Sequence, residues 1–321
     1  MDRRKFINAL GGVAALPMVL RAQEPGRNYR LGVLVPASRM TKAVFEMFDE
    51  LQLNGFVEGQ NLKVIGSFGV TPVEISDGVA AVVKAVPDAI VSGPELYARA
   101  FLAATRAIPL IAISEDLVAE GLVASLAKPG GNLTGISLLS PELDDKRQDI
   151  LIEAVPGIRR LAALADASIT QKRHLEEQQR VAQSHGVELF VFTFVKPSDI
   201  PAALDEAVAR GVQAVNFLAT PIQQINQTLI FERMAALRLP AIYQWADTAE
   251  EGGLIGYGPR FPKVYRQRAR QIVKILRGAK AADIPVEQPA SFELVINLKT
   301  AKAIGHEVPA GLVLRADKLI E

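Results

Sequence analysis

Polar side chains that could hold a small molecule stand just after the apolar segments of this chain. A serine or threonine hydroxyl beside free backbone N–H groups can bind a carboxylate, an aspartate can hold an ammonium group, and an indole can stack on a planar compound. Each type also has a plainer interpretation, because Ser, Thr and Asp are common helix N-caps and Trp commonly fills cores. Their recurrence in both halves favours a binding site formed by Ser38, Ser92, Pro94, Glu95, Ser114, Asp116, Asp166, Thr220, Trp245 and Asp247.

Residue types that support catalysis lack the necessary spacing. The sequence has no nucleophile elbow, no Walker loop and no G-x-G-x-x-G after its first apolar segment. The acidic pairs are interpreted as solvated helix faces and the histidines as surface residues without a metal-binding spacing: Asp144-Asp145, Glu176-Glu177, Glu250-Glu251, His174, His185 and His306. The chain has no cysteine, which excludes thiolate sites, disulfides and a lipidated cysteine. We therefore expect no catalytic residues, no metal and no cofactor.

The elements that must position these side chains follow a strand–helix rhythm that occurs twice. In the first half, strands are expected at 30–36, 61–68, 88–92, 109–114 and 133–138, with helices at 41–54, 74–86 and 95–106. In the second half, a helix at 141–154 precedes strands at 160–165, 187–194, 213–219, 240–245 and 254–257, with helices at 172–184, 200–210 and 222–238. A helix at 261–278 and a strand at 292–297 follow. The pattern predicts an α/β fold of two doubly wound parallel-sheet lobes joined by a hinge, with ligands held at the carboxyl ends of strands.

Composition supports two sizeable cores and argues against a nucleic-acid partner. Of the 321 residues, 49% are hydrophobic and only 6% are aromatic, which suits parallel sheets covered by helices. The formal net charge is +1, and it becomes slightly negative without the basic first 22 residues. No basic surface remains for a phosphate backbone, so nucleic acid is excluded.

The first 22 residues are typical of a secretory signal. Arg3 and Arg4 form a twin-arginine pattern, an apolar stretch runs from 9 to 20, and Ala22 could end a cleavage site. The apolar stretch is too short for a bilayer core, which needs about 20 residues. We therefore expect a protein that is exported to the periplasm, soluble and not lipid-anchored, with a mature chain that begins near Gln23.

Several sequence runs together resemble one family of ABC-transporter substrate-binding proteins, of the tryptophan or aromatic amino-acid type. The runs are Arg3–Phe6, Gly55–Asn61 (GFVEGQN), Gly121–Gly135 (GLVASLAKPGGNLTG), Leu239–Tyr243 (LPAIY), Glu251–Pro259 (EGGLIGYGP) and Phe292–Gly305 (FELVINLKTAKAIG). The resemblance implies the type I periplasmic-binding-protein fold. It also implies a first lobe of 28–156 plus 260–283, a second lobe of 157–259 plus 284–321, and closure of the lobes on a ligand.

The resemblance further implies a monomer that captures a small organic solute, an amino acid or a related aromatic compound, and delivers it to an ABC permease in the inner membrane. Three positions depart from the family pattern. Glu95 replaces a small residue, Leu117 follows Asp116 where Pro is common, and Asp166 replaces Asn or a similar polar residue. The ligand therefore does not follow from the family. Two alternatives are an exported sensor subunit for a membrane kinase and a periplasmic α/β enzyme.

Overall fold

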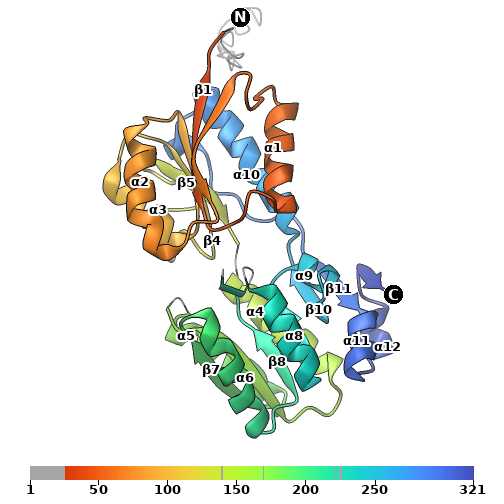
Figure 1. Cartoon of the computed structure of the whole chain (residues 1–321). Coiled ribbons are helices and arrows are strands. Elements are labelled where there is room, and N and C mark those ends of the chain that lie inside the picture. Colours follow the sequence, from red (N-terminus) through yellow and green to blue (C-terminus); the bar gives the residue numbers. More distant parts are fainter. Residues whose placement is uncertain (1–25, 139, 169, 221, 224–225) are drawn as a thin grey trace, which may run out of the picture.

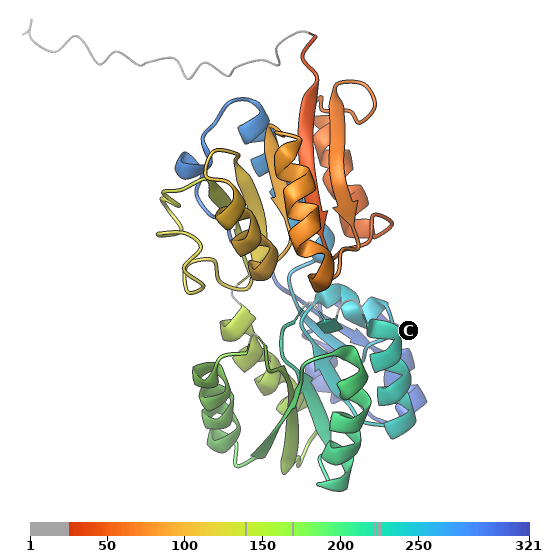
Figure 2. The same cartoon turned by 60° about the vertical axis from the view of Figure 1, so that its left-hand side comes forward.

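The computed structural model describes residues 26–138, 140–168, 170–220, 222–223 and 226–321. The signal peptide that we expect at 1–22 lies outside these residues. The described chain forms two lobes that stand end to end, each built on its own β-sheet (Figures 1 and 2). No helix within the described ranges is both long and apolar enough to span a membrane.

The first sheet is parallel throughout, in the order β2-β1-β3-β4-β5. Its strands are β1 (Tyr29–Val35), β2 (Leu62–Phe68), β3 (Ala89–Ser92), β4 (Leu110–Ser114) and β5 (Leu133–Ser137). Its helices are α1 (Lys42–Leu53), α2 (Ile75–Lys84), α3 (Glu95–Ala104) and α10 (Phe261–Leu276), with short 3-10 turns η1 (Pro72–Glu74) and η3 (Ala281–Asp283).

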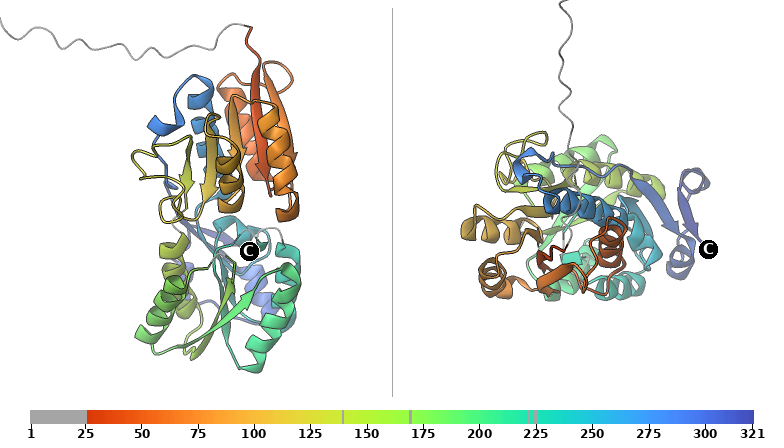
Figure 3. Two further views of the ribbon diagram at one scale, coloured as in Figure 1. Left: turned by 90° about the vertical axis from the view of Figure 1, so that its left-hand side faces the viewer. Right: turned by 90° about the horizontal axis from the view of Figure 1, so that it is seen from above.

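Helices cover both faces of the first sheet because its strands are apolar on both sides. Leu31, Val33 and Val35 of β1 pack in one core cluster with residues of α1 and α10. Leu34 points the other way and packs with residues of α2 and α3. This alternation is the two-residue period of a strand, and it explains the nearly continuous apolar sequence of β1. Helices α1 and α10 lie side by side although they are far apart in sequence (Figures 1 and 3).

The second sheet has the order β12-β11-β10-β9-β8-β6-β7. Its strands are β6 (Arg160–Asp166), β7 (Glu188–Phe194), β8 (Ala214–Phe217), β9 (Ala241–Tyr243), β10 (Ile255–Gly258), β11 (Glu293–Asn297) and β12 (Lys318–Ile320). Its helices are α4 (Ser140–Ala154), α5 (Lys172–Ser184), α6 (Ile200–Ala209), α8 (Gln227–Leu237), α9 (Ala246–Glu250), α11 (Leu298–Ile304) and α12 (Ala310–Val313), with a 3-10 turn η2 (Pro197–Asp199).

The strand order β7-β6-β8-β9-β10 repeats that of the first sheet. Both lobes are therefore doubly wound α/β units, as the sequence predicts, and each has a switch point between its first and third strands. The pairing of β10 with β11 is antiparallel. The second sheet is thus mixed at that edge, which the sequence rhythm did not predict.

The crossings between lobes differ from the expected boundaries. Helix α4, expected in the first lobe, packs against β8, β9 and β10, and its residues Ile150, Leu151 and Ala154 belong to a core cluster of the second lobe. The Pro156-Gly157 turn therefore joins α4 to β6 within one lobe. At the other boundary, Glu287 pairs with the first sheet, donating to Gly135 O at 2.9 Å and accepting from Ser137 N at 2.9 Å.

These contacts support a revised division of the chain. We propose a first lobe of 28–138 plus 259–287 and a second lobe of 140–258 plus 288–321. The chain then passes between lobes after β5, after β10 and after Glu287.

Candidate functional site

The carboxyl ends of strands from both sheets face the junction between the lobes (Figure 3). In a parallel sheet this edge, and the switch point within it, is where ligands bind. Strands β1 and β3 flank the switch point of the first sheet, and β6 and β8 flank that of the second. The sequence-predicted site residues lie at these ends or within a few residues of them.

In the first lobe, Ser92 ends β3 and is completely buried. Its hydroxyl oxygen has no hydrogen-bond partner within the described ranges. The next residue, Gly93, has no room for a side chain, because a Cβ there would lie 2.8 Å from the Tyr97 ring and 2.9 Å from Pro36. The chain therefore turns tightly from β3 into α3. Arg268 of α10 reaches the same turn, with its Nη1 3.4 Å from Ser92 O.

Ser114, at the end of β4, donates a hydrogen bond to the carboxylate of Glu120, 2.7 Å from its Oε1 atom. The Asp116 backbone N–H also donates to Glu120, at 3.2 Å. Burial raises the pKa of the Glu120 carboxyl to about 6, although these hydrogen bonds oppose the shift. Sequence reasoning missed Glu120, because it lies inside a loop rather than directly after a strand.

The other first-lobe candidates are engaged locally. Asp116 caps the turn that follows it, accepting from Val118 N at 3.0 Å and Ala119 N at 3.1 Å. Glu95 pairs with Arg99 one helical turn later, and Pro94 is the N-cap residue of α3. Ser38 is exposed and accepts from Met40 N at 3.3 Å.

In the second lobe, Asp166 and Thr220 lie together as buried neighbours. The Thr220 hydroxyl donates to Asp166 Oδ2 at 2.8 Å, and the Thr220 N–H donates to Gln244 Oε1 at 3.0 Å. The other oxygen of Asp166 accepts from Ser168 N at 2.9 Å. These bonds connect the segments that follow β6, β8 and β9 on the side of the second lobe that faces the junction.

Helix α4 carries a fully buried ion pair, Asp144 with Arg147, close to these strand ends. Arg147 donates through Nη1 to Asp144, through Nε to Tyr257 O at 2.8 Å, and through Nη2 to Gln244 O at 3.0 Å. The interpretation of Asp144 as a solvated residue was therefore wrong, because α4 turns this face toward the second sheet.

The structure also corrects the interpretation of one histidine. The His174 side chain is only 13% exposed, and its Nε2 lies 3.3 Å from Asp144 Oδ2. The His185 side chain, in contrast, is 43% exposed and pairs with Asp149. His306 Nε2 lies 3.0 Å from Ala154 O. Over the residues described, no three His, Asp or Glu side chains gather to hold a metal.

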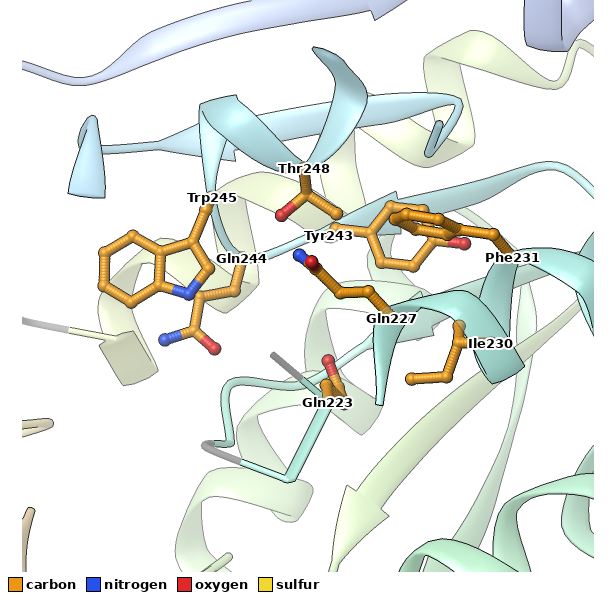
Figure 4. A pocket seen from close by; sticks show the side chains of 8 residues that line it. All are labelled: Gln223, Gln227, Ile230, Phe231, Tyr243, Gln244, Trp245 and Thr248. Atoms are coloured by element: carbon orange, nitrogen blue, oxygen red, sulfur yellow. The ribbon is translucent and has the colours of Figure 1, made fainter. Parts of the chain in front are cut away.

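A small pocket with a volume of about 10 Å³ lies between α8, α9 and the end of β9 (Figure 4). The aromatic side chains at the pocket contact one another and the core. Tyr243 stacks on Phe217 with ring centroids 5.0 Å apart, and Phe231 packs edge-on against Tyr243 with ring centroids 5.5 Å apart. Burial strongly raises the pKa of the Tyr243 phenol, so this side chain stays neutral. The residues that line the pocket are Gln223, Gln227, Ile230, Phe231, Tyr243, Gln244, Trp245 and Thr248.

Trp245 forms one wall of this pocket and also touches the first lobe. Its exposed fraction is 6%, and its ring centroid lies 4.5 Å from that of Phe261, at the start of α10. Nearby, Asp247 Oδ2 accepts from the Phe261 backbone N–H at 2.7 Å, and Oδ1 lies 3.4 Å from Arg260 Nη1. The Asp247 carboxylate therefore caps α10 where the chain crosses between lobes.

This architecture defines a two-lobed binding protein, and the sequence assigns it to a family. A family model of ABC transporter substrate binding proteins matches residues 32–320, so the chain belongs to that family, whose members bind solutes and are not enzymes. The resemblance drawn from the sequence runs is thereby confirmed.

Individual relatives agree with this assignment. The chain is 25% identical over 283 residues to the tyrosine-binding protein of Clostridioides difficile strain R20291, which covers 87% of this chain and 81% of the relative. Two solved structures share the fold at 22% identity, each covering 91% of this chain and 100% of their own. They are a conserved domain protein from Vibrio cholerae, with a TM-score of 0.82, and an ABC domain in complex with L-Trp from Streptococcus pneumoniae, with a TM-score of 0.80.

Proposed function

We propose that this protein captures a small aromatic solute, an amino acid or a related aromatic compound, between its lobes. It then delivers the solute to an ABC permease in the inner membrane. The observation that carries the proposal is the group of aromatic rings at the end of β9, where Trp245, Tyr243 and Phe231 line one small pocket together with Gln223, Gln227 and Gln244. Figure 4 shows the side chains of Gln223, Gln227 and Thr248 directed into the space between these rings.

The chemistry of the pocket suits a planar ligand. Aromatic rings stack on other aromatic rings, and neutral amides form hydrogen bonds without the desolvation cost of a charge. Two of the amides are already engaged through one of their atoms: Gln223 Nε2 donates to Leu218 O at 2.7 Å, and Gln244 Oε1 accepts from Thr220 N at 3.0 Å. The names of two similar proteins support the same ligand class, since one is called a tyrosine-binding protein and another was solved with L-Trp.

The arrangement of the chain supports a closing motion. The lobes are joined by the connections after β5, after β10 and after Glu287, and a ligand that touches both lobes favours the closed arrangement. In this proposal the protein acts as a single chain in the periplasm, and the permease recognises its closed form.

A ligand screen tests the binding proposal. L-Trp, L-Tyr, L-Phe and aromatic acids without an amino group are compared with galactose and ribose by thermal denaturation and titration calorimetry. The aromatic compounds should raise the melting temperature, since a ligand at 100 times its Kd stabilises the folded state by about 2.7 kcal/mol. Binding of the sugars alone would refute the proposed ligand class. Uptake of the labelled ligand by cells with and without the gene tests delivery separately.

A further inference from the structure

Among the described residues, each lobe buries one arginine near the junction, and the two arginines differ in their partners. Arg147 in the second lobe donates from Nε, Nη1 and Nη2 and is paired with Asp144. Arg268 in the first lobe is 2% exposed; its Nη1 makes a long hydrogen bond to Ser92 O at 3.4 Å, and the guanidinium also interacts with the side chain of Tyr265. Its Nε and Nη2 have no hydrogen-bond partner in the part of the chain that the structure describes.

Arg268 also lacks a countercharge among the described residues. Burial lowers the pKa of its guanidinium, and the Tyr265 side chain opposes this through its charge and a hydrogen bond; the Tyr265 ring centroid lies 4.0 Å from the guanidinium carbon. An arginine keeps its proton under all ordinary conditions, so this is a buried positive charge without an acid. Such a charge is costly to the fold unless a partner neutralises it.

The unpaired donors have a specific geometry. Nε–H and Nη2–H lie on the same side of a guanidinium and point in parallel, which is the fork that grips the two oxygens of a carboxylate. The hydroxyl of Ser92, buried and also without a partner, stands at the same turn. Helix α3 begins there with no side-chain cap at Pro94, so its first N–H groups add further positive potential.

We propose that Arg268 and Ser92 form a receptor for a carboxylate group of the ligand. This inference rests on the proposed function and narrows it to aromatic compounds that carry a carboxylate. The carboxylate binds the first lobe at the end of β3, and the aromatic ring packs against the aromatic side chains that line the second-lobe pocket. Three successive side-chain contacts lie between the two places. The guanidinium of Arg268 lies over the Tyr265 ring, the ring centroids of Tyr265 and Phe261 are 4.8 Å apart, and those of Phe261 and Trp245 are 4.5 Å apart.

Pairs of ligands that differ only in the carboxylate test this receptor. L-Trp is compared with tryptamine, L-Tyr with tyramine and L-Phe with phenethylamine, by titration calorimetry on the mature chain. The parent protein should bind the acid of at least one pair ten or more times more tightly than the amine. Equal affinity within every pair that binds would overturn the receptor and leave the aromatic pocket standing. If none of the six compounds binds, and no aromatic acid without an amino group binds either, the proposed function fails and the receptor fails with it.

Two variants then locate the carboxylate. Arg268→Gln should weaken binding of the acid on the order of tenfold to a hundredfold, the usual loss for a charged hydrogen bond, and change binding of the amine less than twofold. Ser92→Ala should produce a smaller loss in the same direction. Arg266→Gln is the matched control, because Arg266 lies on the same helix, is one third exposed and pairs with Glu46. An equal loss for acid and amine in Arg268→Gln would contradict the proposal.

Thermal stability separates this role from a structural one. In the unliganded protein, Arg268→Gln removes an uncompensated buried charge, so its melting temperature should equal or exceed that of the parent. Arg147→Gln leaves Asp144 without its partner and should lower the melting temperature markedly. If Arg268→Gln lowers it as much as Arg147→Gln does, Arg268 is a structural residue. Should Arg268→Gln fail to fold, that outcome also counts as a structural role.

Discussion

Trp245 and Phe261 are in ring contact across the junction of the two lobes, with centroids 4.5 Å apart. Trp245 follows the last residues of β9 in the second lobe, and Phe261 is the first residue of a helix that packs on the first sheet. The wall of the aromatic pocket is thus also part of the contact between lobes. Any rotation of the lobes must change the surroundings of this indole.

The sole tryptophan therefore reports ligand binding. We expect its fluorescence emission to change at saturation with the ligand. Because Trp245 is 6% exposed, Trp245→Ala should also lower the free energy of unfolding by about 3 kcal/mol, toward the lower end of a core Trp→Ala loss. In the folded fraction, ligand binding should weaken by about 0.5–1.5 kcal/mol beyond the lost contact area. A loss of stability with unchanged affinity would make Trp245 a core residue only.

Asp247 should act on stability rather than on the ligand. Its carboxylate accepts from the Phe261 N–H, so Asp247→Ala should cost about 1 kcal/mol of unfolding free energy, as loss of a helix cap does. Asp247→Asn keeps a cap oxygen and should cost less. If instead Asp247→Asn weakens ligand binding by about 1.5–3 kcal/mol at unchanged stability, this side chain holds a donor of the ligand.

The buried Asp144–Arg147 pair gives the sharpest stability prediction. Asp144→Asn leaves Arg147 charged and unpaired, so the free energy of unfolding should fall by about 3–5 kcal/mol. Urea denaturation measures this loss. The matched control is Asp149→Asn on the same helix, whose exposed partner His185 should give a change below about 1 kcal/mol. Similar losses in both variants would show that burial of the pair carries no special cost.

Glu120 should make stability depend on pH. Its pKa is about 6 in the folded state against 4.5 ordinarily, so the folded protein binds more protons than the unfolded chain between these values. Stability contributed by this group is therefore greatest below pH 4.5 and falls as the pH rises toward 6. Glu120→Gln removes this titration and should flatten the profile, by at most about 2 kcal/mol. Urea denaturation from pH 4 to 7 tests it, and parallel profiles of parent and variant would contradict the assignment.

The sequence predicted the elements well because their apolar periods are clear. The expected strand at 187–194 is β7 (Glu188–Phe194), and the expected helix at 172–184 is α5. The error at α4 has a physical reason: a helix beside a lobe crossing has the same amphipathic pattern whichever sheet it covers. Only the long-range contacts of Ile150 and Leu151 decide the lobe.

The positions of the candidate residues in the fold were predictable, but their contacts were not. Ser92, Ser114 and Asp166 are the last residues of β3, β4 and β6, and Thr220 follows the end of β8 by three residues. Their contacts come from residues without a local signal, such as Glu120 in a loop and Arg268 in the middle of a basic helix. A polar side chain at a strand end is free for a ligand only if no distant residue saturates it, and that depends on the tertiary fold.

The late position of α10 in the chain has a consequence during synthesis. One face of the first sheet, including Val33, Val35 and Val91, shares its core cluster with Ile272 and Leu276 of that helix. When only the first 260 residues have been translated, the first lobe therefore still has an apolar face that is partly uncovered. The N-terminal lobe can be completed only after nearly the whole C-terminal lobe has emerged. Chaperones that recognise exposed apolar surface should hold this nascent chain until α10 docks beside α1.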